Sequence, residues 1–371
     1  MKQYKAIRAI ISGGGTGGHI FPAVSIANKL KELNPGTEIL FVGAIGRMEM
    51  EKVPAAGYRI VGLPISGLQR SFSAKSLSNN LALPFKTIIS RCKARRIIMD
   101  FKPDIAIGVG GYASAPLLMA ATRMGIHSLI QEQNSFAGLT NRMLGSKVDR
   151  ICVAYEGMEK FFPAEKIVLT GNPIRSSIRP AERPESDRKH ILVIGGSLGA
   201  GTLNTAMKDW INAGCPGGEG VDVLWQCGKY YKAGIDEFMR KAAESGLDVE
   251  NVRHTDFIRD MDREYALADV VISRAGASSV SELCAAHKAS IFVPSPNVAE
   301  DHQRHNAMAL VEKDAAVMVA DSDAPRTLME TALALVRDSE RIAALERNIA
   351  GLSLTRAAQS IADEVYKILE K

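Results

Sequence analysis

The sequence predicts an α/β fold with two domains, each built on a parallel sheet. Three observations support this fold class. The chain has 371 residues, 46% hydrophobic and 23% charged, which is too long for one ordinary core and sufficient for two. Short apolar runs alternate with amphipathic helical patterns, as parallel strands alternate with their crossover helices. The pattern also starts twice, each time with an apolar run that ends in a glycine-rich turn, at 13–18 and at 195–199.

The first half is expected to form one domain over residues 1–170. Its apolar runs are bounded by turn residues, which is typical of strands. The expected strands are 6–11, 38–43, 58–65, 103–111, 127–134 and 150–155. Helices are expected at 22–33 and 114–125, where apolar residues recur at helical spacing.

The second half is expected to form a domain over residues 171–344. A polar stretch with three prolines at 171–190 predicts the link between the halves. Strands are then expected to begin at 190, 221, 251, 269 and 289, with a helix at 201–213. The helical pattern from about 345 to 371 is expected to pack back on the first domain. One glycine-rich turn at the start of each half indicates two Rossmann-like domains that face a deep cleft between them.

Composition limits the function classes. The net charge of +5 is mild, and the five cysteines are scattered without a C-x-x-C pair. Buried free thiols are therefore expected, and a zinc site is not. The apolar stretch before the first glycines is too short for a signal peptide, and no run approaches the ~18 apolar residues of a membrane span. A cytosolic protein is expected, which could still bind a membrane surface.

The two glycine-rich turns do not fit a dinucleotide site. Gly13, Gly15 and Gly18 match G-x-G-x-x-G, but that motif also needs an acid at the end of the second strand to hold a ribose. The second strand here ends on Gly43, and Glu38 lies at its beginning. Neither turn has the G-K-[ST] ending of a P-loop. The glycines either only permit a tight strand-to-helix turn, or they also present backbone N–H groups to a phosphate or a sugar hydroxyl.

A third turn, Arg274–Ser279, follows a buried strand and precedes a helix. Ser279 and Glu282 match an S-x-x-E capping box, which is one explanation for both residues. A cap alone does not require a run of small residues, whereas a diphosphate at a helix N-terminus does. We favour the second interpretation, in which Glu282 accepts two hydrogen bonds from a ribose diol.

Several polar residues invite a metal interpretation, which we reject. His302, Gln303 and His305 follow the next strand, but no ligand set of clear spacing joins the histidines. Gln303 there is suited to sugar hydroxyls. The D-x-D pairs at 260–262 and 321–323 are interpreted as acids of loops or helix starts. No metal is expected.

Taken together, "GGGTGGHIFPA", "EQNSFAGLTNR", "GGSLGA", "SRAGASSVSE" and "AEDHQRHNA" resemble the MurG family of bacterial glycosyltransferases. "GVGGYASAP" and "GNPIR" also match, in the order that the family shows, so the resemblance covers the whole chain. It implies the GT-B fold and transfer of N-acetylglucosamine from UDP-N-acetylglucosamine to the 4-hydroxyl of a muramyl-pentapeptide on diphospho-undecaprenol. UDP-N-acetylglucosamine is then a substrate, and no cofactor is implied. Other cell-wall enzymes are conceivable partners.

The resemblance also implies site residues. Asn134 matches a donor-sugar contact, and it is also a candidate catalytic residue beside His19. One departure is His302, where some members have a second glutamine. The implied donor-binding residues are Thr16, Gly17, Gly18, Asn134, Arg175, Ser197, Ile258, Ala277, Ser278, Ser279, Val280, Ser281, Glu282 and Gln303.

An inverting transfer needs a base for the acceptor hydroxyl and stabilisation of the departing diphosphate. His19 follows the first glycine turn, and an unperturbed imidazole is largely neutral near pH 7, so His19 is the candidate base. Alternatively, His19 caps its helix or orients a substrate, while Asn134 or Glu132 polarises the acceptor. The helix start at 277–282 and Arg175 are expected to serve the leaving group.

Residues 66–102 concentrate the positive charge and intersperse it with apolar side chains. Such a segment suits the anionic inner leaflet, so we expect peripheral binding at the cytoplasmic face of the inner membrane. Nucleic acid is a weaker interpretation because few aromatic residues are present for stacking. The turn with Gly111 and Tyr112 is expected to contact the acceptor's diphosphate. The residues assigned to acceptor or membrane are Gly111, Tyr112, Lys75, Leu77, Leu81, Phe85 and Lys86.

Two other functions remain open from the sequence. A UDP-N-acetylglucosamine epimerase can use the same fold, because fold does not determine function. A non-catalytic UDP-sugar sensor would keep the donor residues and have no use for His19.

Overall fold

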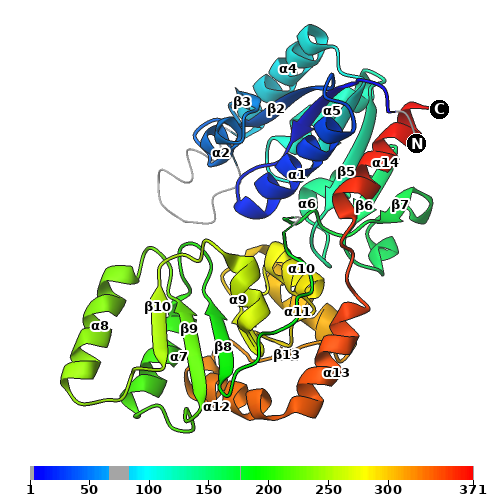
Figure 1. Cartoon of the computed structure of the whole chain (residues 1–371). Coiled ribbons are helices and arrows are strands. Elements are labelled where there is room, and N and C mark those ends of the chain that lie inside the picture. Colours follow the sequence, from blue (N-terminus) through cyan, green and yellow to red (C-terminus); the bar gives the residue numbers. More distant parts are fainter. Residues whose placement is uncertain (1–3, 67–82, 176, 371) are drawn as a thin grey trace. The chain divides into compact units, whose positions relative to one another are not determined.

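The computed structural model describes residues 4–66, 83–175 and 177–370. The chain divides into two compact units, shown in Figure 1. Unit 1 comprises Met1–Ile174 with Arg356–Lys371, and unit 2 comprises Arg175–Thr355. The predicted two-domain α/β organisation with parallel sheets is confirmed. The roles of the two domains and the cleft between them stay predictions.

Unit 1 is built on a parallel sheet with strand order β3-β2-β1-β4-β5-β6-β7. The sheet order reverses between β1 and β4, and at such a point the loops after the two strands diverge and leave room for a ligand. The strands are β1 Arg8–Ser12, β2 Glu38–Ala44, β3 Arg59–Leu63, β4 Ile105–Gly108, β5 His127–Glu132, β6 Arg150–Val153 and β7 Ile167–Leu169.

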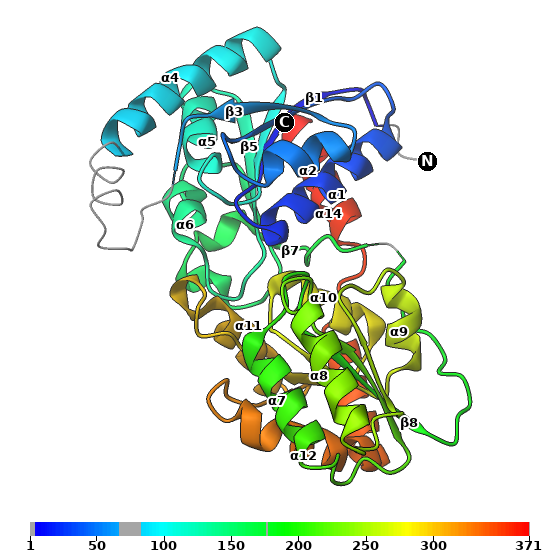
Figure 2. The ribbon, with the colours of Figure 1, turned by 90° about the vertical axis from the view of Figure 1, so that its left-hand side faces the viewer.

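Helices cover both faces of this sheet (Figures 1 and 2). Side chains alternate along each strand, so Ile11 packs with α1 and α14 while Ile10 packs with α4, α5 and α6. This two-sided burial explains the nearly continuous apolar runs in the sequence. The helices are α1 Gly17–Leu33, α2 Glu49–Ala55, α4 Leu83–Phe101, α5 Ser114–Arg123, α6 Leu139–Gly145 and α14 Ala357–Leu369, with short 3₁₀ turns at Met158–Lys160 and Ala164–Lys166.

Unit 2 repeats the same topology with strand order β10-β9-β8-β11-β12-β13, again parallel. Its order reverses between β8 and β11. The strands are β8 Lys189–Ile194, β9 Val221–Gln226, β10 Val252–Thr255, β11 Val270–Ser273, β12 Ser290–Phe292 and β13 Val317–Met318. The helices are α7 Gly201–Asn212, α8 Lys232–Glu244, α9 Met261–Leu267, α10 Ala277–Ala286, α11 His302–Val311, α12 Ala324–Arg337 and α13 Ser339–Ala350, with a 3₁₀ turn at Ala299–Asp301.

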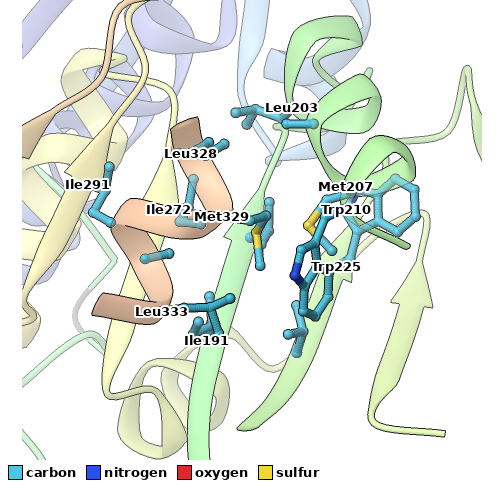
Figure 3. Packing of buried hydrophobic residues seen from close by; sticks show 14 of the residues in the cluster. Ile191, Leu203, Met207, Trp210, Trp225, Ile272, Ile291, Leu328, Met329 and Leu333 are labelled. Carbon is cyan, nitrogen blue, oxygen red and sulfur yellow. The ribbon is translucent and has the colours of Figure 1, made fainter. Parts of the chain in front are cut away.

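The core of unit 2 lies between its sheet and helices α7 and α12 (Figure 3). Trp225 of β9 is fully buried there, and its indole N–H donates to Asn204 of α7 at 2.9 Å. Burying a large apolar side chain of this kind stabilises a fold by about 1.5–3 kcal/mol. The bond to Asn204 also satisfies the one polar atom of the indole, so burial of Trp225 leaves no donor without an acceptor.

The C-terminal helical segment differs from the expectation in one respect. Residues from about 345 were expected to pack on the first domain as one piece, but α13 ends at Ala350 and belongs to unit 2, where Leu345 lies in the core. Only α14 packs on unit 1, with Ile361 and Val365 fully buried against α1 and β1. Arg150 of β6 pairs with the buried Glu364 of α14 at 3.6 Å, which fixes this helix on the sheet.

Two further expectations concern the whole chain. Four of the five cysteines are buried as expected, but Cys92 on α4 is exposed. Within the ranges that the structure covers, no helix is both long and apolar enough to span a bilayer.

Candidate functional site

The first glycine turn joins β1 to α1 and carries His19 in the first turn of the helix. Thr16 is the N-cap residue, with extended backbone and no side-chain capping bond. His19 Nδ1 lies 3.0 Å from the carbonyl oxygen of Gly14 and 3.5 Å from Thr16 Oγ1. Gly17 and Gly18 are partly exposed on the same turn. The His19 ring thus contacts the glycine turn that precedes its own helix.

The contact with Gly14 determines the tautomer of the His19 ring. A carbonyl oxygen can only accept a hydrogen bond, so Nδ1 carries a proton, and in the neutral ring Nε2 then keeps a lone pair. A Cβ atom at Gly110 would come within 2.8 Å of Nε2, and Gly110 has φ +95°. Glycine at this position therefore leaves open the space beside the atom that could accept a proton.

The turn after β4 lies directly against the first glycine turn. Gly14 N–H donates to the Gly110 carbonyl at 3.3 Å. Gly111 has φ +90°, and a Cβ atom there would overlap the backbone of Gly14. Tyr112 follows with 45% of its surface exposed. The structure thus brings Gly111 and Tyr112 next to the turn that carries His19, at the point where the strand order reverses.

The turn after β5 contains Glu132 and Asn134. Glu132 is 2% exposed and accepts four hydrogen bonds. Asn134 supplies two of them, from its backbone N–H at 3.0 Å and from Nδ2 at 3.3 Å. The Gly138 N–H and Asn141 Nδ2 supply the others, at 3.0 and 2.9 Å. These four bonds hold the turn and position the Asn134 side chain against the Glu132 carboxylate.

The third turn, between β11 and α10, lies at the strand-order reversal of unit 2. Gly276 is the N-cap residue of α10, and no side chain caps the helix. The capping-box explanation of Ser279 and Glu282 is therefore wrong: α10 begins at Ala277, and the Glu282 side chain bonds elsewhere. The helix start is lined by the partly exposed residues Ala277, Ser278, Ser279 and Ser281, with Val280 buried beneath them.

Glu282 is buried and holds two partners. Oε1 accepts from Arg175 Nε and Nη2 at 3.1 and 3.0 Å, and Oε2 accepts from the Tyr265 hydroxyl at 3.3 Å. Burial raises the pKa of Tyr265 well above its usual value, and the nearby Glu282 charge adds to this, so the phenol stays a donor. The structure thus brings together Arg175 and Glu282, 107 residues apart in the sequence.

The other predicted donor residues of unit 2 follow neighbouring strands. Ser197 is exposed after β8, and Ile258 is buried after β10. Gln303 lies near the start of α11 and accepts from the backbone N–H of Ser295 at 2.9 Å. His302 is the first residue of α11, and its Nε2 lies 3.9 Å from Oε2 of Glu300 in the preceding 3₁₀ turn.

The acids of the two D-x-D pairs have structural partners. The Asp260 side chain caps α9 by accepting from Arg263 N–H, as expected for a helix-start acid. Asp321 pairs with Arg274 of the third turn and accepts from Thr202 Oγ1 at 3.0 Å. Across the described part of the chain, no group of three or more His, Cys, Asp or Glu side chains is placed to hold a metal ion.

The proposed membrane segment is described only in part. Lys75, Leu77 and Leu81 lie outside the described residues. On α4, Phe85, Ile88 and Ile89 are 72%, 60% and 55% exposed, and Lys86 donates to Ser66 Oγ at 3.5 Å. An exposed apolar stripe therefore begins this helix, and the exposed Lys93, Arg95 and Arg96 follow it.

Sequence reasoning missed two buried side chains that support the site. Tyr265 on α9 contacts Glu282, and Glu49 on α2 contacts the first glycine turn. Neither residue belongs to a motif, and each meets its partner only through the packing of a separate helix. The one sequence signal that could have indicated Glu49 is the presence of a glutamate shortly after the second strand of a Rossmann-like domain.

The fold and the site define a two-domain α/β protein with a polar site at the strand-order reversal of each sheet. Family models agree with this division. The glycosyltransferase family 28 N-terminal domain matches residues 9–153, and the glycosyltransferase family 28 C-terminal domain matches residues 190–364. The chain belongs to glycosyltransferase family 28.

Curated relatives match over the whole chain. Proteins named UDP-N-acetylglucosamine–N-acetylmuramyl-(pentapeptide) pyrophosphoryl-undecaprenol N-acetylglucosamine transferase include those of Parabacteroides distasonis and Cytophaga hutchinsonii. The first is 52% identical and covers 100% of both chains. The second is 51% identical and covers 100% of this chain and 99% of its own.

Solved structures show the same architecture. MurG of Acinetobacter baumannii aligns with a TM-score of 0.78 at 27% identity, over 97% of this chain and 99% of its own. A UDP-N-acetylglucosamine 2-epimerase aligns with a TM-score of 0.62 at 14% identity, over 97% of this chain and 95% of its own. At that identity the epimerase shares the fold alone.

Proposed function

We propose that this protein transfers N-acetylglucosamine from UDP-N-acetylglucosamine to the 4-hydroxyl of a lipid-linked N-acetylmuramyl-pentapeptide, with inversion at the anomeric carbon. The observation that carries this proposal is the identity of 51–52% over the full length with relatives named for that transfer. Peptidoglycan synthesis is the process to which such a product belongs. An epimerase function is disfavoured because the epimerase structures share only 12–14% identity with this chain.

Unit 1 supplies the groups suited to the acceptor. His19 holds its Nδ1 proton on the Gly14 carbonyl, so Nε2 is the atom that takes the proton of the attacking hydroxyl. The adjoining turn with Gly111 and Tyr112 offers backbone groups to the acceptor's diphosphate. Asn134, held by Glu132, is a second polar group suited to orient a sugar. A sensor without catalysis would need none of these features.

Unit 2 supplies the groups suited to the donor. The N-terminus of α10 carries partial positive charge and small residues, which suits the UDP diphosphate as it gains charge during the reaction. Glu282 offers both carboxylate oxygens to the ribose diol. Arg175 is 54% exposed and bonds only one of those oxygens, so we expect its guanidinium to move from Glu282 to the diphosphate, which replaces one anionic partner by another. This arrangement needs no metal or cofactor.

A transfer assay tests the proposal. Labelled UDP-N-acetylglucosamine is incubated with a lipid-linked muramyl-pentapeptide acceptor, with and without excess EDTA, and released UDP and labelled lipid are both counted. We expect equal amounts of UDP and product, with little change on chelation. UDP release without labelled lipid, or 2-epimerised sugar, would contradict the transferase proposal. Loss of activity on chelation would contradict the metal-free part alone.

We further propose that α4 docks on the anionic inner leaflet, at the cytoplasmic face of the membrane. Replacing both Phe85 and Ile88 with Ser removes two exposed apolar side chains, each worth up to about 1.5–3 kcal/mol when buried. Sedimentation with phosphatidylglycerol vesicles should show at least tenfold weaker binding of this variant. Tyr230→Ser, at an 82% exposed position in unit 2, is the control that should bind like the parent. Equal binding by all three proteins would contradict docking through α4.

A further inference from the structure

One buried carboxylate in unit 1 has no role in the reaction described so far. Glu49, the first residue of α2, is 1% exposed. Its Oε2 accepts from the Gly15 N–H at 2.9 Å, and its Oε1 accepts from the Ala44 N–H at 3.0 Å. Burying a carboxylate is costly unless hydrogen bonds compensate it. An ordinary helix start would leave such a side chain in water, so its inward position calls for a specific explanation.

The surrounding chain makes room for this side chain. A Cβ atom at Gly43 would lie 2.6 Å from Glu49 Cγ, and one at Gly14 would overlap the Glu49 carboxyl group. Two glycines, one in the first glycine turn and one near the end of β2, therefore leave room for one buried carboxylate. This explains a glycine at the end of β2, where a dinucleotide-binding fold would carry its ribose-binding acid.

A single peptide unit links the Glu49 carboxylate to the His19 ring. The N–H of Gly15 and the C=O of Gly14 belong to the same planar peptide and point in opposite directions. Glu49 accepts at one end of this peptide, and His19 Nδ1 donates at the other end, at 3.0 Å. Hydrogen bonds in series polarise one another, so the carboxylate strengthens the acceptor that His19 uses.

The same peptide is flanked by glycines and could otherwise rotate. Gly15 has φ +87°, in a region where glycine moves at little steric cost. If the peptide turned over, its N–H would face His19, and Nδ1 would have to accept. The proton would then lie on Nε2, and that atom could no longer take a proton from a hydroxyl.

We propose that Glu49 is a positioning residue that locks the Gly14–Gly15 peptide and thereby holds His19 in its Nδ1–H tautomer. This inference rests on the proposed function for the role of His19 as the base. Glu49 itself does not touch a substrate. A neutral amide at position 49 can donate as well as accept, so Glu49→Gln permits both orientations of the peptide.

The test measures the tautomer and the turnover separately. In protein labelled with ¹⁵N-histidine, the His19 ring signals, assigned with His19→Gln, should report the Nδ1–H tautomer. Glu49→Gln should shift them towards the Nε2–H tautomer and lower kcat about 10–100-fold, within the range of a general base. The KM for UDP-N-acetylglucosamine should stay within about twofold, because unit 2 is untouched. Glu51→Gln, at an exposed position on the same helix, is the matched control.

A double variant separates positioning from a general structural effect. Glu49→Gln should add no further loss of kcat to His19→Ala, because it acts through the same ring. An unchanged tautomer in Glu49→Gln, or losses that multiply in the double variant, would overturn the inference. Full turnover by His19→Ala would instead refute the base in the proposed function, while the tautomer measurement still decides the role of Glu49. If Glu49→Gln does not fold, Glu49→Asp keeps the charge but shortens its reach, and the same two measurements apply.

Discussion

His19→Ala should lower kcat by about 10²–10⁴-fold, the usual contribution of a general base, and leave UDP affinity within about twofold of the parent. The structure supports this split because His19 belongs to unit 1, whereas Arg175, Glu282 and Gln303 belong to unit 2. The pH dependence should change too. A base acts only when unprotonated, so kcat/KM of the parent should rise with pH as the His19 imidazole loses its proton. The variant should lack this rise.

His127→Ala is the matched control for this experiment. His127 is also in unit 1, but it is the first residue of β5, at the amino end of the parallel strands, whereas His19 follows the carboxyl end of β1; His127 pairs with Asp149 at 3.5 Å. Its replacement should change neither kcat nor the pH profile. Turnover of His19→Ala equal to that of the parent would assign the proton to another acceptor. Unchanged turnover with weakened UDP binding would mean that His19 contacts the donor.

Glu282→Ala should weaken UDP binding by about 10–100-fold, measured by calorimetry. Hydrogen bonds to a charged group contribute about 1.5–3 kcal/mol each, and a buried carboxylate facing a ribose diol would make two. Part of that gain is offset because Arg175 must leave Oε1. The loss should appear with UDP and nearly vanish with 2′,3′-dideoxy-UDP, because that ligand lacks the hydroxyls that Glu282 is proposed to bind.

Glu237→Ala serves as the control for Glu282→Ala. Glu237 is an exposed acid of unit 2 on α8, paired with Lys241 at 2.8 Å, and its loss should leave UDP affinity unchanged. An equal effect of Glu282→Ala on UDP and on the dideoxy ligand would contradict the ribose contact. It would indicate that Glu282 only orders the Arg175 side chain.

The architecture was predictable because strands buried on both faces of a sheet leave a strong pattern in the sequence. Parallel strands covered on both faces read as apolar runs, and the glycine-rich turns at 13–18 and 195–199 mark the start of each sheet. The short strands β7 and β13 were not predicted. They have three and two residues, none of them fully buried, so they leave too little pattern to recognise.

Within the site, the motifs identified the turns but not the bonds between them. The S-x-x-E spacing suggested a cap, whereas the actual partners of Glu282 are Arg175 and Tyr265, from two other segments. Similarly, an acid does follow the second strand, five residues beyond Ala44, but Glu49 turns inward to the backbone. Such pairings depend on which helices pack together, and local sequence spacing does not encode that.

The return of α14 to unit 1 has a consequence for biosynthesis. The residues of unit 2 end at Thr355, whereas Ile361 and Val365, which complete the core around β1 and α1, are translated after them. Vectorial synthesis usually lets the N-terminal domain fold first. In this protein the N-terminal domain is completed last. Until α14 has been made, the apolar surface of unit 1 that this helix covers remains exposed.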